Sequence, residues 1–552
     1  MENVLICLIL LLILVVAGIL SRAAPSFPAP LIQIILGAAT ATFFPTFHVG
    51  FNPEVFMLLF IPPLLFSDSW RFPKREFLIN SRAIIMLSIG LVLFTVAGMG
   101  YFIHWLVPTI PLAASFALAA ALSPTDAVAL KSMTAKSGIP DRIKHILQGE
   151  ALLNDASGLV SFKFAIIALL TGFFSLTDAA VSLVIIGAGG LITGMVLTYL
   201  FMAVLGRLNH TRDDETTIDN LLLLLLPYAA FLAAERLGFS GILAAVSAGF
   251  TVDKAGFLDK TMANMRIEGR FVWGLLEVTL NGIVFILLGL YLPNSLVLIE
   301  QTGTTFAECA VIICIITLML IGFRFLWIYL TLPFEALIAR RMHTSWQFPN
   351  LKIVTAIAFG GVRGAIALAA ILSLPAFMPD GAFLPVRDLL IAIVVGVVLC
   401  SLVLSTAVLP LILPGLKNLI SHSPEEEEND ARIYAAQAAI RAIQAKTEAL
   451  MNGLSDSETK LCEEISHSLV ATLNQFIEAS SSGNDSARKT SIKALELEET
   501  LRLAGLDGAR KELRALRRRG EINNTTLVSV MHRLDLRQIS LLNERKKSIE
   551  SI

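Results

Sequence analysis

Two carboxylates and an amide lie close together in a stretch that otherwise has the composition of a membrane helix. Glu150, Asn154 and Asp155 stand in the segment QGEALLNDASG at 148–158. On a helix, Glu150 and Asn154 share one face, and Asp155 lies about 100° further round. A carboxylate at bilayer depth is costly, so it usually faces a cavity, an ion path or a partner. The segment therefore predicts either an ion and proton site or a structural polar cluster between packed helices.

The composition of the chain indicates what surrounds this helix. The 552 residues are 55% hydrophobic and 16% charged, with a mean hydropathy of +0.74. Soluble domains carry roughly 25% charged residues, so we expect a polytopic membrane protein in direct contact with the lipid bilayer. A formal net charge of -1 gives no basis for nucleic-acid binding. The five cysteines form no CxxC pair, which argues against a disulfide framework or a zinc site, and we expect no cofactor.

Apolar runs long enough to cross a bilayer predict an all-α fold with about thirteen transmembrane helices. The first run resembles a secretory signal, but no basic residue precedes it, so we interpret it as a retained helix. Alternate loops are rich in Lys and Arg, which predicts an external N-terminus and a cytoplasmic C-terminal region. The predicted spans are 3–20, 28–46, 54–68, 82–107, 111–134, 146–173, 178–205, 218–236, 239–254, 270–293, 305–333, 351–374 and 387–415.

The composition changes sharply after the last predicted span. We expect a transmembrane domain at 1–415, an acidic linker at 416–430 and a cytoplasmic helical domain at 431–552. Amphipathic patterns in the last region predict a soluble helical bundle that either regulates the protein or stabilises a dimer. The predicted helices are 431–452, 456–479, 485–505, 509–519 and 524–547, and one apolar stripe holds Leu461, Ile465, Leu469, Leu473 and Phe476.

The fifth and twelfth predicted spans have helix-breaking centres. The fifth reads ALSPTDA at 121–127, where Pro124 removes a backbone hydrogen bond. The twelfth reads FGGVRG at 359–364, three glycines round a cation. If spans 1–6 and 8–13 form inverted repeats, the two breaks correspond and cross at the midplane, which is typical of a secondary transporter's binding site. The alternative is a pair of ordinary proline and glycine kinks.

The charged residues at membrane depth require partners. Arg324 lies in an apolar span, so we pair it with Glu150, which leaves Asp155 free to exchange its ligand. Opened backbone near Asp126 frees carbonyls and amide ends. Asp126 then either neutralises a helix N-terminus or contacts the substrate directly. Arg363 either balances the carbonyl ends of its own broken helix or contacts the substrate.

Taken together, these motifs resemble the monovalent cation/proton antiporters of the NhaP and NHE type, especially bacterial members with a cytoplasmic helical tail. The motifs are Glu150-x-x-x-Asn154-Asp155, Thr125-Asp126, Gly360-Gly361-x-Arg363-Gly364 and the lone Arg324, and the likeness covers residues 1–415. The resemblance implies a homodimer in the cell (inner) membrane that serves pH homeostasis. It also implies that Asp155 binds Na+ or H+ beside Thr125 and Asp126, that Asn154 replaces a second aspartate of electrogenic relatives, and that Glu150 pairs with Arg324.

Two positions depart from the family pattern. Ala151 stands where a serine often ligates the cation, and Ser67, followed by Asp68, stands where several relatives have an acid on the third helix. We expect Ser157 or a water to supply the missing oxygen. Ser67 and Asp68 remain candidate contributors from the third helix.

Competition of cation and proton for one carboxylate then predicts the function. Because either ligand neutralises Asp155, only loaded forms cross the low-dielectric barrier readily, and exchange is expected to be electroneutral. The expected substrates are H+ and Na+, Li+ or K+. A cation channel is the nearer alternative, separable by whether flux is coupled to protons. An intramembrane serine protease built on Gly238-Phe239-Ser240-Gly241 is a weaker alternative because no histidine follows centrally in a span.

Overall fold

The chain forms two compact units, Met1–Leu419 and Ile420–Ile552, and each is considered separately. Every regular element in the described part of the chain is helical, which confirms the predicted all-α fold class. The computed structural model describes residues 2–24, 27–44, 53–126, 129–130, 141–172, 176–208, 216–255, 263–301, 305–341, 350–374, 386–412, 424–451, 456–481, 485–519 and scattered positions from 521 to 538.

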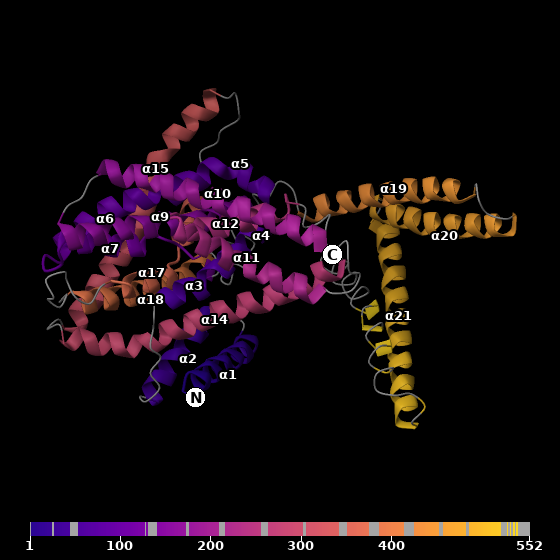
Figure 1. The fold of residues 1–552 in the computed structure, drawn as a ribbon, viewed down its shortest axis with the longest axis horizontal. Coiled ribbons are helices and arrows are strands. Elements are labelled where there is room, and N and C mark those ends of the chain that lie inside the picture. Colours follow the sequence, from indigo (N-terminus) through magenta and orange to yellow (C-terminus); the bar gives the residue numbers. More distant parts are fainter. Residues whose placement is uncertain are drawn as a thin grey trace. The chain divides into compact units, whose positions relative to one another are not determined.

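The helices of the first unit, labelled in Figure 1, are described here as two groups according to which helices pack on each other. In the first group, called here the α14 bundle, α14 packs on α2 and α12 packs on α4 and α10. Its members are α1 (Glu2–Ala23), α2 (Ala29–Phe43), α3 (Pro53–Leu59), α4 (Ile61–Arg71), α10 (Leu176–Leu208), α11 (Thr216–Arg236), α12 (Gly241–Val252) and α14 (Ala263–Gln301).

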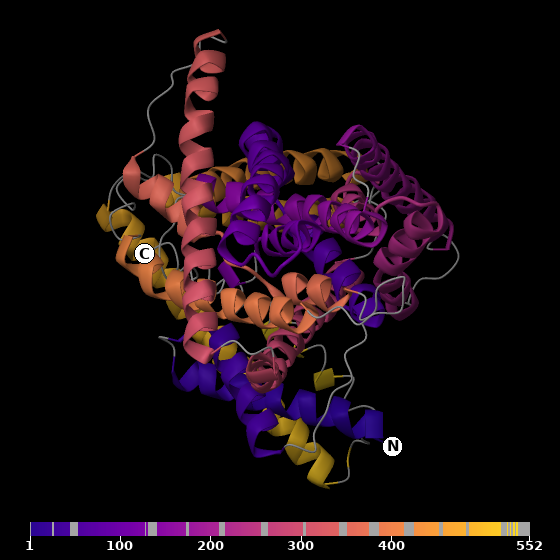
Figure 2. The ribbon, with the colours of Figure 1, turned by 90° about the vertical axis from the view of Figure 1, so that its left-hand side faces the viewer.

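The second group, called here the α9 bundle, surrounds the helix that carries Glu150 and Asp155. Figure 2 shows its helix α15 as one long rod that extends past the neighbouring helices. The members are α5 (Lys74–Ile85), the π-helix η1 (Met86–Leu91), α6 (Val92–Leu106), α7 (Leu112–Leu122), α9 (Asp141–Thr171), α15 (Phe306–Arg341), α16 (Leu351–Phe359), α17 (Ala365–Leu372) and α18 (Arg387–Ile412).

Length and apolar composition qualify eight of the described helical stretches to cross a membrane. They are α1, the continuous α5–η1–α6 stretch, α9, α10, α11, α14, α15 and α18, and each coincides with a predicted span. Three further predicted spans correspond to shorter apolar helices, namely α2, α7 and α12. The total of thirteen spans and their inverted repeat stay predictions.

Three predicted spans are interrupted, one more than expected. The breaks in the fifth and twelfth spans are confirmed, because α7 ends at Leu122 and residues 360–364 separate α16 from α17. The third span was predicted as one helix, but it divides into α3 and α4 at Phe60. Pro62 and Pro63 explain this break, since two successive prolines lack the N–H groups that a continuing helix needs but fit the first turn of α4.

In its described part, the second unit contains three long helices, α19 (Pro424–Met451), α20 (Asp456–Ser481) and α21 (Asp485–Arg519). The Thr447 hydroxyl on α19 donates to the Ser466 hydroxyl on α20 at 3.0 Å. The predicted helices 485–505 and 509–519 are in fact one helix, because an isolated glycine such as Gly508 costs only about 1 kcal/mol between good helix formers. Most of the predicted helix 524–547 lies outside the described residues.

Most described side chains of the predicted apolar stripe on α20 are exposed in the single chain. Leu461, Ile465 and Leu469 are exposed, at 57%, 53% and 50% of their surface. Leu473 is half-buried, and the side chain of Phe476 lies outside the described residues. Apolar rows of this kind on a soluble helix normally contact another surface.

Candidate functional site

The unwound centres of the fifth and twelfth spans meet inside the α9 bundle. Pro124 ends one helix and the Gly360-Gly361 pair ends the other, so both segments have free backbone groups. The Asp126 amide N–H donates to the Val362 carbonyl at 2.7 Å. This backbone hydrogen bond joins two segments that are far apart in the sequence and makes a crossing of two broken helices.

Charges at the crossing compensate helix ends. The Arg363 Nε group donates to the carbonyl of Leu122, the last residue of α7, at 3.1 Å, and the same guanidinium donates to the Gly361 carbonyl. Arg363 thus donates to carbonyl groups of both broken helices, whereas the sequence predicted either compensation of its own helix or contact with the substrate. Asp126 lies against the start of α17, since a Cβ added at Gly364 would lie 2.5 Å from its Oδ2 atom. A carboxylate is favourable at a helix N-terminus.

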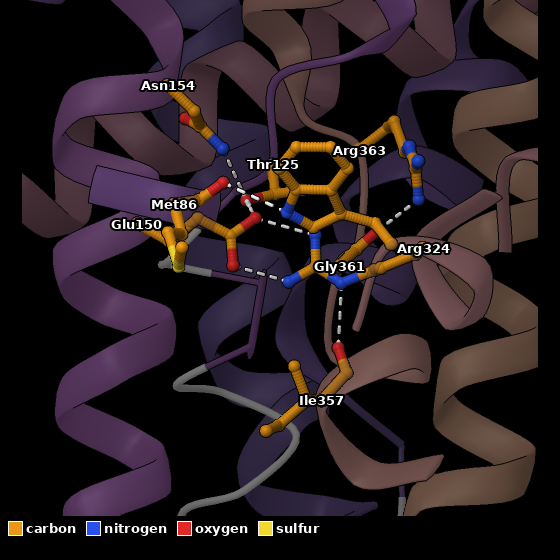
Figure 3. A network of polar contacts seen from close by, with 9 residues as sticks. Met86, Thr125, Glu150, Asn154, Arg324, Ile357, Gly361 and Arg363 are labelled. Carbon is orange, nitrogen blue, oxygen red and sulfur yellow. Dashed lines mark hydrogen bonds and ion pairs between the residues drawn. The ribbon is translucent and has the colours of Figure 1, made fainter. Parts of the chain in front are cut away.

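The predicted partners Glu150 and Arg324 form a bidentate ion pair (Figure 3). Arg324 Nη1 donates to Glu150 Oε1 at 2.6 Å, and Nη2 donates to Oε2. The Arg324 Nε group donates to the Ile357 carbonyl near the end of α16 at 2.9 Å. Glu150 is 1% exposed and Arg324 is 2% exposed. These contacts place the Glu150 carboxylate against a fixed cation, so it is poorly suited to exchange ligands.

A short polar chain connects this pair with the broken fifth span (Figure 3). The Asn154 Nδ2 group donates to the Thr125 hydroxyl at 2.7 Å, and that hydroxyl donates to Glu150 Oε1 at 3.4 Å. The Asn154 Oδ1 atom is buried and has no hydrogen-bond partner within the part of the chain that the structure describes. Asn154 therefore orients Thr125, and through it the crossing, relative to α9.

Asp155 faces a cavity of about 70 Å³ between the two bundles. By the volume that one water needs, the cavity has room for a cation and a few waters. Asp155 is 4% exposed, and no hydrogen bond or ion pair to another described residue holds its carboxylate. The residues that line the cavity are Phe56, Phe60, Ile61, Leu64, Leu65, Asp68, Pro124, Thr125, Asp126, Ala151, Leu152, Asp155, Asn281, Val284, Gly364, Ile366 and Ala367.

The cavity collects some of the predicted site residues and omits others. The cavity is lined by Asp68, Thr125, Asp126 and Asp155. Ala151 also lines it, at the position where the family pattern often has a serine. Three carboxylates on one small cavity favour a cation there. Hard cations such as Na+ select oxygen ligands of the kind that Asp155 and Thr125 carry.

Three further candidates do not line the cavity. The Ser157 hydroxyl lies 2.5 Å from the Ser88 carbonyl in η1 and 3.0 Å from the Asn154 carbonyl, so it is hydrogen-bonded to backbone. Ser67 is buried, and its hydroxyl finds no partner among the described residues. Asn154 contributes through Thr125, as described above. The Ser157 hydroxyl therefore donates its proton to backbone, and Ser157 does not line the cavity.

Two residues of the site were not anticipated. Asn281 of α14 lines the cavity, and its signal in the sequence was a lone carboxamide within an apolar span. Trp327 of α15 donates its indole N–H to the Met86 carbonyl at 3.0 Å, at the start of η1. A π-helix leaves carbonyls without regular partners, and the sequence gives no signal of that need.

The crossing of broken helices beside a buried carboxylate without a partner among the described residues defines a class of protein, the secondary ion transporters of the membrane. Residues 9–414 match the family described as "Sodium/hydrogen exchanger, transmembrane". The chain therefore belongs to the sodium/hydrogen exchanger family of multi-pass membrane proteins.

Individual relatives agree with this assignment. An uncharacterized Na+/H+ exchanger of Escherichia coli K12, YjcE, is 40% identical over 99% of this chain and 100% of its own length. The sodium, potassium, lithium and rubidium/H+ antiporter of Bacillus subtilis 168 is 41% identical over 75% of this chain and 62% of its own. The sodium proton antiporter MjNhaP1 of Methanocaldococcus jannaschii shares the fold, with 17% identity, a TM-score of 0.57, and coverage of 75% of this chain and 99% of that one.

Proposed function

We propose that this protein exchanges Na+, Li+ or K+ for protons through competition of the two ligands for the Asp155 carboxylate. The observation that carries the proposal is the contrast between two neighbouring acids on α9. Glu150 is held by Arg324, whereas Asp155 faces the cavity with no partner among the described residues. Only the second acid is arranged to gain and lose a ligand.

The exchange rule follows from the cost of a bare charge in a low-dielectric wall. A proton or a cation neutralises Asp155. The loaded site therefore crosses the low-dielectric barrier at a lower free-energy cost than a site with an empty, charged carboxylate. Thr125 would present its hydroxyl to the cation, and Asp126 would add negative charge to the cavity. Because no empty form moves readily, entry of one ligand requires exit of the other.

Replacing the exchanging carboxylate tests this proposal directly. Asp155→Asn keeps the shape of the side chain but cannot alternate between charged and neutral forms, so we expect folded protein without cation-driven proton movement. Reconstituted liposomes with an internal pH dye and an imposed Na+ gradient measure the exchange. Asp388→Asn at the start of α18, outside the cavity, is the matched control and keeps the activity. Normal exchange by Asp155→Asn would remove Asp155 from the mechanism.

We propose further that the exchange is electroneutral. Asp155 carries the charge that exchanges and Asn154 stays neutral, so one cation leaves for each proton that enters. A potential of 100 mV would then exert no drive, whereas one uncompensated charge would add about 2.3 kcal/mol. The measurement fixes both gradients in liposomes and clamps the potential at zero or 100 mV with a K+ ionophore, after K+ has been excluded as a substrate. An equilibrium point that moves with the potential contradicts the one-to-one exchange.

The orientation and assembly of the protein are part of the same proposal. The Lys- and Arg-rich loops favour a cell (inner) membrane location with the N-terminus outside and the second unit in the cytoplasm. The exposed row Leu461, Ile465 and Leu469 supports a role of α20 in a homodimer. Cross-linking of a cysteine placed at Ile465 in membranes would test whether two copies meet there.

The two alternative functions have different signatures. A cation channel would pass Na+ without moving protons in the opposite direction, so the liposome measurement separates it from an antiporter. For a serine protease, Ser240 would need a free hydroxyl beside a base. The Ser240 oxygen instead accepts a hydrogen bond from the Leu243 N–H at 3.2 Å as the N-cap of α12. This capping role supports the antiporter over the protease.

A further inference from the structure

Asn281 lines the same cavity as Asp155 and brings a carboxamide to it from a different helix. It lies on α14, within the apolar run Val278-Thr279-Leu280-Asn281-Gly282-Ile283-Val284, and it is half-buried. No hydrogen bond joins its side chain to any other residue in the described part of the chain. A polar side chain at membrane depth is costly when it has no partner, so its ligand is expected to come from the cavity.

The second carboxamide of the site differs in both respects. Asn154 does not line the cavity, and its Nδ2 group is bound to Thr125 at 2.7 Å. The oxygen of Asn154 is buried away from the cavity and cannot reach an ion there without rearrangement. Asn281 is therefore the carboxamide whose oxygen is available to a bound ion.

We propose that Asn281 supplies an oxygen ligand, directly or through one water, to the cation held at Asp155, and so sets cation affinity independently of proton affinity. This inference rests on the proposed exchange at Asp155. A hard monovalent cation needs several oxygen donors. On α9, Ala151 offers none at the position where a hydroxyl was expected, and Ser157 is bonded to backbone. Asn281 fills that deficit from across the cavity.

The two competing ligands need Asn281 to different extents. A proton on Asp155 forms a covalent O–H bond and needs no set of further oxygens. A cation loses much of its hydration on entry and depends on each replacement donor. Removal of the Asn281 oxygen should therefore weaken cation binding while it leaves protonation of Asp155 unchanged.

With Asn281 as a ligand, the residues that bind the cation come from both bundles. Asp155 and Thr125 belong to the α9 bundle, whereas Asn281 belongs to the α14 bundle. A bound cation would contact both bundles, but a bound proton would contact one. At the depth of the cavity, the two bundles are thus held together more strongly in the cation-loaded form than in the proton-loaded form.

The test compares Asn281→Leu, which keeps the branched shape and removes the oxygen, with Asn281→Asp, which keeps an oxygen in place. For Asn281→Leu we expect the KM for Na+ to rise at least about tenfold, equal to 1.4 kcal/mol of lost binding. The maximum rate should stay within about twofold, because the loss concerns binding and not passage. Asn281→Asp should keep the KM within about threefold of the wild type.

Val278→Ala is the matched control, because Val278 lies on the same helix one turn away but is 64% exposed and does not line the cavity. Its KM should equal that of the wild type. An unchanged KM in Asn281→Leu would overturn the inference, and so would an equal rise in Asn281→Leu and Asn281→Asp. Exchange that survives Asp155→Asn would instead overturn the proposed function. The two failures are therefore distinguishable in one set of liposome measurements.

Discussion

The ion pairs Glu150–Arg324 and Lys74–Asp253 occupy contrasting places in the membrane unit. The first joins α9 to α15 inside one bundle, and its side chains are 1% and 2% exposed. The second joins α5 of the α9 bundle to the C-cap of α12 in the α14 bundle, with side chains 22% and 28% exposed. Asp253 also accepts a hydrogen bond from the Trp70 indole at 3.0 Å.

The difference in burial separates a permanent contact from a breakable one. If either partner of a buried pair is removed, the other charge stays uncompensated in a low-dielectric interior. At a partly exposed pair, water and neighbouring donors replace the lost partner at little cost. Motion between the bundles can therefore break Lys74–Asp253 but leaves Glu150–Arg324 intact.

The largest effect is expected from Glu150→Gln. This change leaves the Arg324 guanidinium buried without a counter-charge, so we expect a loss of about 3–5 kcal/mol in the free energy of unfolding. Denaturant unfolding in detergent micelles measures it. The double variant with Arg324→Met should recover much of the stability, because it removes the orphan charge. Additive losses in the double variant would mean that Arg324 depends on a different partner.

An intermediate effect is expected from Gly361→Ala. The added Cβ would lie 2.8 Å from Arg324 Nη1 and 2.9 Å from its Cζ atom, and the ion pair prevents the guanidinium from moving aside. Overpacking of this kind costs about 1–3 kcal/mol. Gly322→Ala is the control on α15, since no atom lies within 4 Å of its added Cβ. Equal stability of the two variants would show that the backbone or side chains around Gly361 shift to make room for the added Cβ.

The smallest effect is expected from Lys74→Met at the boundary between the bundles. Asp253 keeps the hydrogen bond from Trp70, so we expect a loss of no more than about 1 kcal/mol. The difference from the wild type should shrink further in high salt, because exposed charges are screened. Thermal unfolding at low and high ionic strength measures both. A loss as large as that of Glu150→Gln would erase the contrast between the two pairs.

The sequence could predict those parts of the site for which few partner residues or few local conformations are possible. Very few charges lie at membrane depth, so Arg324 had a short choice of partners and Glu150 was identified. Pro124 and the paired glycines predicted the helix breaks, because proline lacks a backbone N–H and glycine destabilises a helix. The same rule applied to Pro62 and Pro63, and the break there was overlooked.

Other features depend on packing that no local pattern encodes. The Arg363 guanidinium reaches the carbonyl end of α7, which only the folded crossing brings near. Lys74 had many acidic residues in neighbouring loops as candidate partners, so Asp253 could not be singled out. Ser157 or a water was expected to supply an oxygen to the ion, and the bond that the Ser157 hydroxyl donates to η1 had no signal in the sequence.

The bond from Arg363 to the Leu122 carbonyl has a consequence for the making of the protein. Its two ends are 241 positions apart in the chain. At ordinary rates of synthesis, roughly 10–50 s pass between the appearance of α7 and that of its cap. During this interval the broken end of α7 lacks the donor that satisfies it in lipid. A chain that stops before residue 350 would lack this donor permanently and leave the Leu122 carbonyl without its cap.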